Sequence, residues 1–220
     1  ADSLAWISEL ANHPSIIIWV ATNESPSEQE KWELEKLIPA IKKLDPSRLV
    51  MRAARLTEDI KDIHCYDGFG FGSEGDFYRV INDVAEFKKK DLRNRPIVNS
   101  EYIEGFPPVR RLKWTGSTEY TEEAKLVYAQ FGLEQTESMR RLGYDGILPY
   151  MYAMWTKRHD RPAWKSEFPT PMYAALKSAL SPVAVSIDLF NRNFEAGKKL
   201  STPIYLINDT PYNQPVKVSY

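Results

Sequence analysis

Asn12-His13-Pro14-Ser15-Ile16-Ile17-Ile18-Trp19-Val20-Ala21-Thr22-Asn23-Glu24-Ser25 is the stretch that decides the fold. Its apolar part has the length of a strand and is rich in β-branched residues, which is typical of a strand buried on both faces in a parallel sheet. The polar tip therefore lies at the carboxyl end of that strand. Because α/β folds bind their ligands at this end of the sheet, Glu24 is a candidate catalytic residue.

The composition limits the kind of protein that this carboxylate can serve. The chain has 220 residues, of which 43% are hydrophobic and 27% charged, as in an ordinary globular protein. Its 29 basic and 30 acidic residues leave a formal net charge of -1. This balance argues against a nucleic-acid partner and is better suited to a neutral ligand.

Several classes of protein are excluded by what the sequence lacks. A single cysteine, Cys65, rules out an intrachain disulfide and a cysteine-based zinc site. No stretch approaches the roughly 20 apolar residues that cross a bilayer, so we expect no membrane partner. Residues 1–6 have neither an initiator Met nor a signal-peptide pattern, so we expect a cut or processed N-terminus. The compartment stays open, with a soluble periplasmic or secreted protein as one alternative.

The opening design recurs at Arg95-Pro96-Ile97-Val98-Asn99-Ser100-Glu101-Tyr102, an apolar strand that also has a glutamate at its tip. Elsewhere, short apolar runs alternate with helical patterns, which predicts an α/β fold with a parallel sheet and right-handed crossovers. The other predicted strands are 48–54, 60–66 and 146–152, and the predicted helices are 2–11, 27–44 with a kink or a break at Pro39, 77–90, 121–142 and 171–180.

The pattern of apolar residues changes from helical spacing to alternation at Ser181-Pro182. Apolar residues then alternate with other residues over 183–189, and two further β-like runs follow at 200–207 and 214–220. This pattern predicts the beginning of an antiparallel, immunoglobulin-like β-sandwich. We therefore expect two domains, 1–181 and 182–220.

Glu24 and Glu101 end strands of one predicted parallel sheet, so a barrel would bring their carboxylates together. Two carboxylates about 5 to 5.5 Å apart are what retaining glycoside hydrolysis needs. One attacks the anomeric carbon, and the other protonates the leaving oxygen and later deprotonates water. The alternative interpretation is that either glutamate caps a helix or lies solvated in a loop.

Four pieces of the sequence resemble glycoside hydrolase family 2, the β-galactosidase and β-glucuronidase group of retaining barrel enzymes. Residues 12–24 are similar to the family's N-H-P-S-I-x-x-W segment and its strand-four Asn-Glu, and 96–102 to its strand-seven P-I-x-x-x-E-Y. Residues 146–155 resemble strand eight with its terminal tryptophan, and 181–210 resemble the sandwich domain that follows. The resemblance implies a partial (β/α)8 TIM barrel, strands four to eight, followed by the start of an immunoglobulin-like β-sandwich.

The resemblance also implies roles for individual residues. Glu24 would be the general acid/base and Glu101 the nucleophile. Asn23 would hydrogen-bond the 2-hydroxyl of the sugar and Tyr66 would position the nucleophile. Trp155 would offer a flat apolar face to a sugar ring, the alternative being a tryptophan of the core or of loop packing. The implied substrate is an oligo- or polysaccharide with a terminal β-linked sugar, and we expect no cofactor and no metal.

One position departs from the family pattern, and the histidines need separate consideration. The family's β-galactosidases commonly have a histidine where this chain has Glu104, so galactose specificity does not follow. We expect His13 to fix the approach to the first strand and His159 to lie in a solvated loop. His64 has two interpretations: it touches the site from a strand end, or it is a satisfied interior histidine.

A complete (β/α)8 barrel takes about 250 residues, whereas this sequence accounts only for strands four to eight. We therefore expect a piece of a longer polypeptide, inactive alone, whose missing N-terminal barrel segments come from the same polypeptide or another chain. Two other functions stay open. One is an endo-acting hydrolase of the same clan, and the other is a non-catalytic carbohydrate-binding or scaffold fragment.

Overall fold

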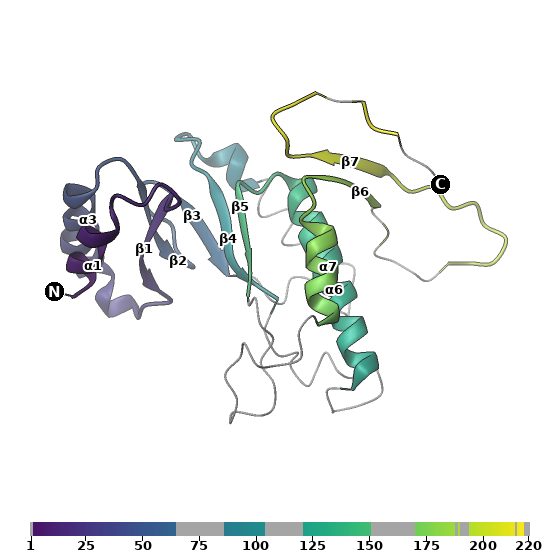
Figure 1. Ribbon diagram of the computed structural model, residues 1–220, viewed down its shortest axis with the longest axis horizontal. Helices are drawn as coiled ribbons and strands as arrows, with labels where there is room; N and C mark the ends of the chain where they lie inside the picture. The colour runs from purple at the N-terminus through teal and green to yellow at the C-terminus, as the bar shows by residue number, and fades with distance from the viewer. Residues whose placement is uncertain are drawn as a thin grey trace. The chain divides into compact units, whose positions relative to one another are not determined.

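The computed structural model describes residues 2–64, 86–103, 121–150, 170–187, 189, 194–213 and 215–217. The chain divides into two compact units (Figure 1). The first contains Ala1–Cys65, Glu86–Tyr102 and Asp145–Leu148, and the second contains Tyr66–Ala85, Ile103–Tyr144 and Pro149–Tyr220.

The first unit contains helices and strands, as the sequence predicts, although no helix separates β2 from β3. β1 pairs with β2 in parallel, and β4 lies between β3 and β5 in a second sheet in which β3 and β4 are parallel. The strand expectations are thus confirmed for the described residues. The elements are α1 (Asp2–Leu10), β1 (Ile18–Asn23), β2 (Leu49–Ala53), β3 (Lys61–His64), a helical segment at 86–90, β4 (Ile97–Tyr102) and β5 (Gly146–Pro149).

The core of this unit lies where α1 and α3 (Ile38–Leu44) cover the β1-β2 sheet. Apolar residues at helical spacing on both helices meet the apolar side chains of the two strands, which removes them from water. A second cluster joins β2 to the neighbouring sheet through Met51, Ile60 and Val98. The first cluster consists of Ile7, Trp19, Leu37, Ile38, Ile41 and Val50.

The helix predicted over 27–44 is divided into short segments. They are a 3₁₀ turn (η1, Ser27–Gln29), α2 (Glu30–Trp32), a π-helical turn (η2, Glu33–Leu37) and α3. In the π turn the N–H of Ile38 donates to the carbonyl of Glu33. Pro39 follows directly and has no N–H to donate, so the ordinary ladder cannot continue there. The predicted kink therefore takes the form of a wider turn just before the proline.

A buried carboxylate fixes the entry to β1. The indole Nε1 of Trp19 donates to Asp45 Oδ2 over 2.8 Å, and the guanidinium of Arg48 pairs with the same oxygen. Arg48 also donates to the carbonyls of Ile16, over 2.6 Å, and His13, over 2.8 Å. The exposed His13 thus contributes its backbone to the approach to the strand, in keeping with the structural role expected for it.

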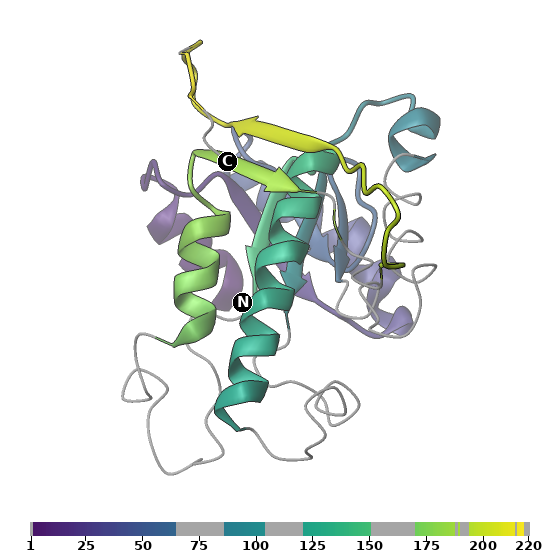
Figure 2. The same cartoon turned by 90° about the vertical axis from the view of Figure 1, so that its right-hand side faces the viewer.

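The second unit contains α6 (Glu122–Leu142) and α7 (Pro171–Ala179), which lie side by side (Figure 2). Thr121 caps α6 by accepting the N–H of Ala124, and Gly143 ends it in the left-handed conformation with φ 70°, both as predicted. At Gly132 an added Cβ would lie 2.6 Å from Met172 Sδ, so a glycine is what lets the two helices approach this closely.

After α7 the chain forms β6 (Val183–Ile187) and β7 (Ile204–Asn208), which pair in antiparallel fashion as predicted. The sequence also predicts a β-like run over 214–220. The structure describes residues 215–217 of this run, and they do not form a strand. The boundary at Ser181-Pro182 and the complete sandwich stay predictions. None of the described helices is long and apolar enough to cross a membrane.

The Asp45 cluster predicts how stability depends on pH. Hydrogen bonds from Ser47 and then from Trp19 hold the pKa of Asp45 well below its ordinary range. Such a carboxylate stabilises the fold fully above the unfolded pKa of about 3.9, and this contribution is lost as the pH falls toward the folded pKa. We expect Asp45→Asn to lower the urea midpoint at pH 7. Between pH 5 and pH 3 the variant should lose less stability than the native chain does, because it no longer has this carboxylate to protonate.

Tryptophan fluorescence during urea unfolding at several pH values measures both effects. Glu28→Gln, at an exposed position in η1, is the control and should leave the midpoint and its pH dependence as they are. An Asp45→Asn chain that loses stability on acidification as steeply as the native chain would contradict the assignment.

Candidate active site

The two predicted glutamates lie at the carboxyl ends of their strands. Glu24 directly follows β1, and Glu101 is the penultimate residue of β4. The pairing register of both strands shifts by one residue before the glutamate. The extra residue is Ala21 in β1, three residues before Glu24, and Ser100 in β4, directly before Glu101. An irregularity of this kind bends a strand and redirects its side chains, and it is common beside active sites.

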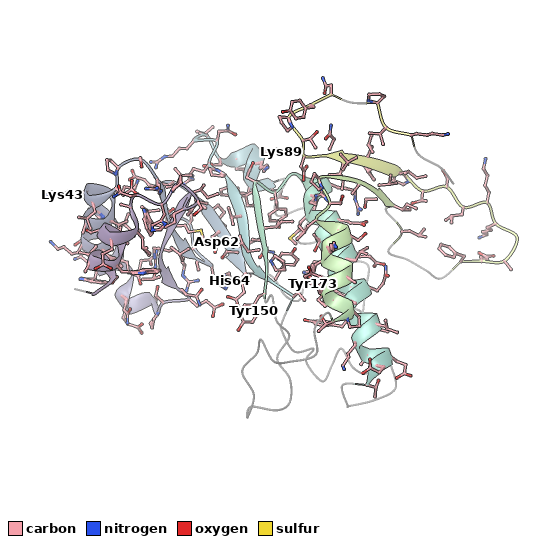
Figure 3. All side chains as sticks on the ribbon, viewed as in Figure 1. Lys43, Asp62, His64, Lys89, Tyr150 and Tyr173 are labelled. Atoms are coloured by element: carbon pink, nitrogen blue, oxygen red, sulfur yellow. The ribbon has the colours of Figure 1, made fainter. Side chains whose placement is uncertain are left out.

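His64 is the last residue of β3 (Figure 3), and its side chain lies beside both carboxylates. Its Nδ1 lies 2.6 Å from Glu24 Oε1 and 3.5 Å from Glu101 Oε2. A ring nitrogen of His64 and one carboxylate oxygen from each glutamate all lie within 4.8 Å of one another. The side chain of His64 is 4% exposed, that of Glu101 19% and that of Glu24 53%, so solvent reaches the pair from the side of Glu24.

The backbone of Glu24 has a φ of 46°, in the left-handed region that a non-glycine residue rarely adopts. Such a conformation costs on the order of 1–3 kcal/mol and needs support from its surroundings. The next residue, Ser25, is buried, and its Oγ donates to Glu33 Oε2 over 3.0 Å. Arg52 Nε donates to the same oxygen over 2.6 Å, and Arg52 Nη1 donates to Glu30 Oε1 over 2.9 Å. A buried ion pair therefore anchors the chain next to the candidate catalytic residue.

A second polar group lies behind His64. The buried carboxylate of Asp62 accepts the N–H of Ala54 over 2.6 Å, and the N–H and Oγ of Ser100 over 3.0 and 2.8 Å. Ser100 Oγ is 3.2 Å from His64 Nε2, and Asp62 Oδ2 is 3.6 Å from the same nitrogen. The imidazole is thus held between two carboxylates on its Nδ1 side and a serine and a third carboxylate on its Nε2 side.

The sequence analysis did not identify Asp62 or Ser100. The sequence could have indicated Asp62, because Asp62 and His64 are polar residues two positions apart in a predicted strand and therefore project from the same face. Ser100 gives no such signal, since its direction depends on the register shift in β4. His64 fits both of its interpretations, because its side chain contacts Glu24 at the strand end and is also buried, with a hydrogen-bond partner at each ring nitrogen.

The remaining sequence candidates divide into two groups. Asn23 is the last residue of β1 and is exposed next to Glu24, at the same end of the strand. Tyr66, Glu104, Trp155 and His159 lie outside the described residues. Their roles stay predictions.

Glu24, His64 and Glu101 also form the one group among the described residues whose donor atoms are close enough together to hold a metal ion. We assign no ion to it. The 2.6 Å separation of His64 Nδ1 and Glu24 Oε1 is a hydrogen-bond distance, and two ligands of one ion at about 2.0–2.2 Å each are held farther apart than this.

Residues 5–109, just under half of the chain, match the family model described as "Glycosyl hydrolases family 2, TIM barrel domain". This match confirms the resemblance to glycoside hydrolase family 2 that the two glutamate segments indicate, and it covers both glutamates and His64. No curated protein matches the sequence.

Solved structures with a similar arrangement include an FMN-binding β-glucuronidase from Facaelibacterium prausnitzii L2-6. It has 17% sequence identity and a TM-score of 0.51, and the match covers 84% of this chain and 33% of that one. The Ruminococcus gnavus β-glucuronidase has 21% identity and a TM-score of 0.47, covering 73% and 31% of the two chains. The Rhizomucor miehei family 5 mannosidase (E301A mutant) has 18% identity and a TM-score of 0.44, covering 68% and 44%.

The chain therefore spans less than half the length of each of these structures. The similarity to the F. prausnitzii protein concerns the fold alone. Together with the family match and the parallel pairing of β1 with β2 and of β3 with β4, it identifies the α/β fold as part of a TIM barrel.

The buried ion pair beside Glu24 gives a testable prediction. Removing one partner of such a pair leaves a buried charge without its counterion and costs about 3–5 kcal/mol, whereas replacing both with apolar residues is often close to neutral. We expect Arg52→Met to destabilise the chain by about this amount, and Arg52→Met combined with Glu33→Met to recover most of it. Urea unfolding measures both free energies.

Arg93→Met removes an exposed arginine and is the control, expected to change stability by less than about 0.5 kcal/mol. The single variant Glu33→Met completes the comparison. If the double variant were destabilised by as much as Arg52→Met and Glu33→Met added together, the two side chains would not be energetically coupled, and the buried ion pair would not support the chain at Glu24.

Proposed function

We propose that the polypeptide to which this chain belongs is a retaining glycoside hydrolase that cleaves a terminal β-linked sugar from an oligo- or polysaccharide. The observation that carries the proposal is the approach of Glu24 and Glu101, whose nearest donor oxygens lie within 4.8 Å around His64. Inverting enzymes hold a water between carboxyl groups about 6.5–9.5 Å apart, whereas direct attack on the sugar suits the shorter separation of about 5–5.5 Å.

In the first step an oxygen of Glu101 attacks the anomeric carbon and the bond from that carbon to the glycosidic oxygen breaks. Glu24 gives its proton to the leaving oxygen. In the second step Glu24 takes a proton from a water molecule, whose oxygen attacks the same carbon and releases Glu101. The difference in exposure supports this division, because the more exposed Glu24 can exchange protons with water and leaving groups while Glu101 is largely shielded.

The other sequence candidates complete the proposal. Asn23 would bind the 2-hydroxyl, Tyr66 would position Glu101, and Trp155 would stack on a sugar ring. The proposed exo action follows the β-galactosidase and β-glucuronidase group. We do not propose galactose as the sugar, because Glu104 occupies the position of the histidine common in that group's β-galactosidases.

We also propose that further barrel strands, from the same polypeptide or another chain, pair with β1. Among the described residues β1 pairs with β2 alone, and Ile17 and Val20 at this sheet are exposed. An apolar strand with a free edge is normally covered in a folded protein. Activity is therefore assayed in the intact polypeptide, and the chain alone is expected to be inactive.

The decisive experiment is covalent labelling of the intact polypeptide with 2-deoxy-2-fluoro β-glycosyl fluorides, followed by mass spectrometry of the peptides. Glu101→Gln should abolish labelling, because no carboxylate remains to attack the anomeric carbon. Glu24→Gln should still be labelled, since fluoride leaves without a proton. The same variant should lose about 10²–10⁴-fold in kcat/KM on substrates with poor leaving groups.

The exposed Glu58→Gln is the matched control and should behave as the native protein. Labelling that persists in Glu101→Gln would refute the nucleophile. Cleavage of internal bonds without release of terminal sugars would identify an endo-acting enzyme. Carbohydrate binding without labelling or hydrolysis by the native protein would identify a non-catalytic protein and refute the proposal.

A further inference from the structure

We propose that Asp62 and Ser100 form a positioning relay that fixes the hydrogen of His64 on Nε2, so that Glu24 faces a ring nitrogen that accepts a hydrogen bond. Nothing in the family match or in the two-carboxylate mechanism requires these residues. Their catalytic consequence rests on the proposed function, whereas the protonation of the ring does not.

The relay begins with the carboxylate of Asp62, which is fully buried. Its two oxygens accept the backbone N–H groups of Ser100, at Oδ1, and Ala54, at Oδ2. Ser100 Oγ is 2.8 Å from Oδ2, and a carboxylate can only accept. The single hydroxyl hydrogen of Ser100 is therefore directed at Asp62.

The consequence for His64 follows from counting donors and acceptors. With its hydrogen committed to Asp62, Ser100 Oγ presents a lone pair to His64 Nε2, 3.2 Å away. Nε2 must then carry a hydrogen, and in a neutral imidazole Nδ1 is the acceptor. In the neutral ring, the 2.6 Å contact between Nδ1 and Glu24 Oε1 contains the proton of the Glu24 carboxyl group, whereas a doubly protonated ring would donate from Nδ1 to an ionised Glu24.

This arrangement distinguishes the two glutamates. Glu24 is at hydrogen-bond distance from Nδ1, whereas Glu101 Oε2 is 3.5 Å away. With one proton held at Glu24, the general acid of the proposed function, Glu101 is the carboxylate that attacks the anomeric carbon. When Glu24 gives this proton to the glycosidic oxygen, the leaving group departs as an alcohol and Glu24 becomes the carboxylate that accepts a proton from water.

The strand geometry independently supports the relay. Asp62 and His64 are two residues apart in β3 and so project from the same face (Figure 3). In a regular β4, Ser100 and Glu101 would project from opposite faces. Ser100 is the extra residue at the register shift, which allows Ser100 and Glu101 both to reach His64.

The first test is the protonation of the His64 ring in the intact polypeptide labelled with ¹⁵N at histidine. Long-range ¹H–¹⁵N correlation spectra distinguish protonated from unprotonated ring nitrogens, and comparison with His64→Gln identifies the signals of His64. We expect Nε2 to be protonated and Nδ1 to be unprotonated. An unprotonated Nε2 or a protonated Nδ1 in the native protein would overturn the proposal, whether or not the protein hydrolyses glycosides.

The second test uses Asp62→Asn, which keeps the size of the side chain. With the new amide nitrogen in the place of Oδ2, an amide N–H donates to Ser100 Oγ, whose hydroxyl can then turn and donate to Nε2, and this shifts the ring hydrogen to Nδ1. The N–H of Ala54 loses its acceptor in this variant, and the N–H of Val50 does so in the Asp59→Asn control. An Nδ1–H group donates to an ionised Glu24 and removes the acid. We expect kcat to fall about tenfold or more on substrates with poor leaving groups, with KM and the rate on dinitrophenyl glycosides changed little.

Asp59→Asn is the matched control. Asp59 also accepts a backbone N–H, from Val50, and pairs with Lys42, but it belongs to the turn before β3 and not to the His64 relay. Ser100→Ala is a second variant, because it removes the link at Nε2 and leaves Asp62 Oδ2 at 3.6 Å, beyond hydrogen-bond distance. It should show the same dependence on the leaving group. If kcat fell equally on substrates with good and with poor leaving groups in both variants, Asp62 and Ser100 would have a structural role only, and the proposal would be wrong.

Discussion

The hydrogen bond between His64 and Glu24 is the contact on which the site depends, because it joins the ends of two strands that do not pair with each other. Glu24 follows β1, His64 ends β3, and Glu101 comes from β4. Each strand is fixed by its own backbone ladder, so the three side chains converge only if all the strands end at the same level. Parallel pairing places the carboxyl ends along one edge within each of the two sheets, and the buried cluster of Met51, Ile60 and Val98 joins these sheets.

Regular strands alone would not aim these side chains correctly. β1 contains an extra residue three positions before Glu24, β4 contains one directly before Glu101, and Glu24 itself has a left-handed backbone. These irregularities cost free energy, and they persist because the surrounding structure fixes them. Beside Glu24 that support is the Ser25 hydroxyl on the buried pair of Glu33 and Arg52, and the π turn that carries Glu33 is a further irregularity in the same region.

The parts of the structure that follow from local patterns were predictable from the sequence. Apolar runs predicted the strands, and Thr121 and Gly143 predicted the two ends of α6. The recurrence of a strand with a glutamate at its end predicted that Glu24 and Glu101 lie close together. The register shifts were not predictable, because an extra residue in a strand changes neither composition nor hydrophobicity. The pairing of Arg52 with Glu33 was hidden for another reason. A predicted strand and a predicted helix do not indicate which of their charged residues meet.

The distribution of buried polar groups suggests why the chain retains them. Arg52 and Glu33 lie beside the strand end of Glu24, and Asp62 holds Ser100, the residue before Glu101. Apolar residues at these positions would avoid the cost of desolvating charges, and a buried ion pair is therefore weak evidence of stability. What apolar residues cannot do is orient a backbone or a hydroxyl group by hydrogen bonds. Each of the two glutamates therefore has its own polar support, and both carboxylates lie beside His64.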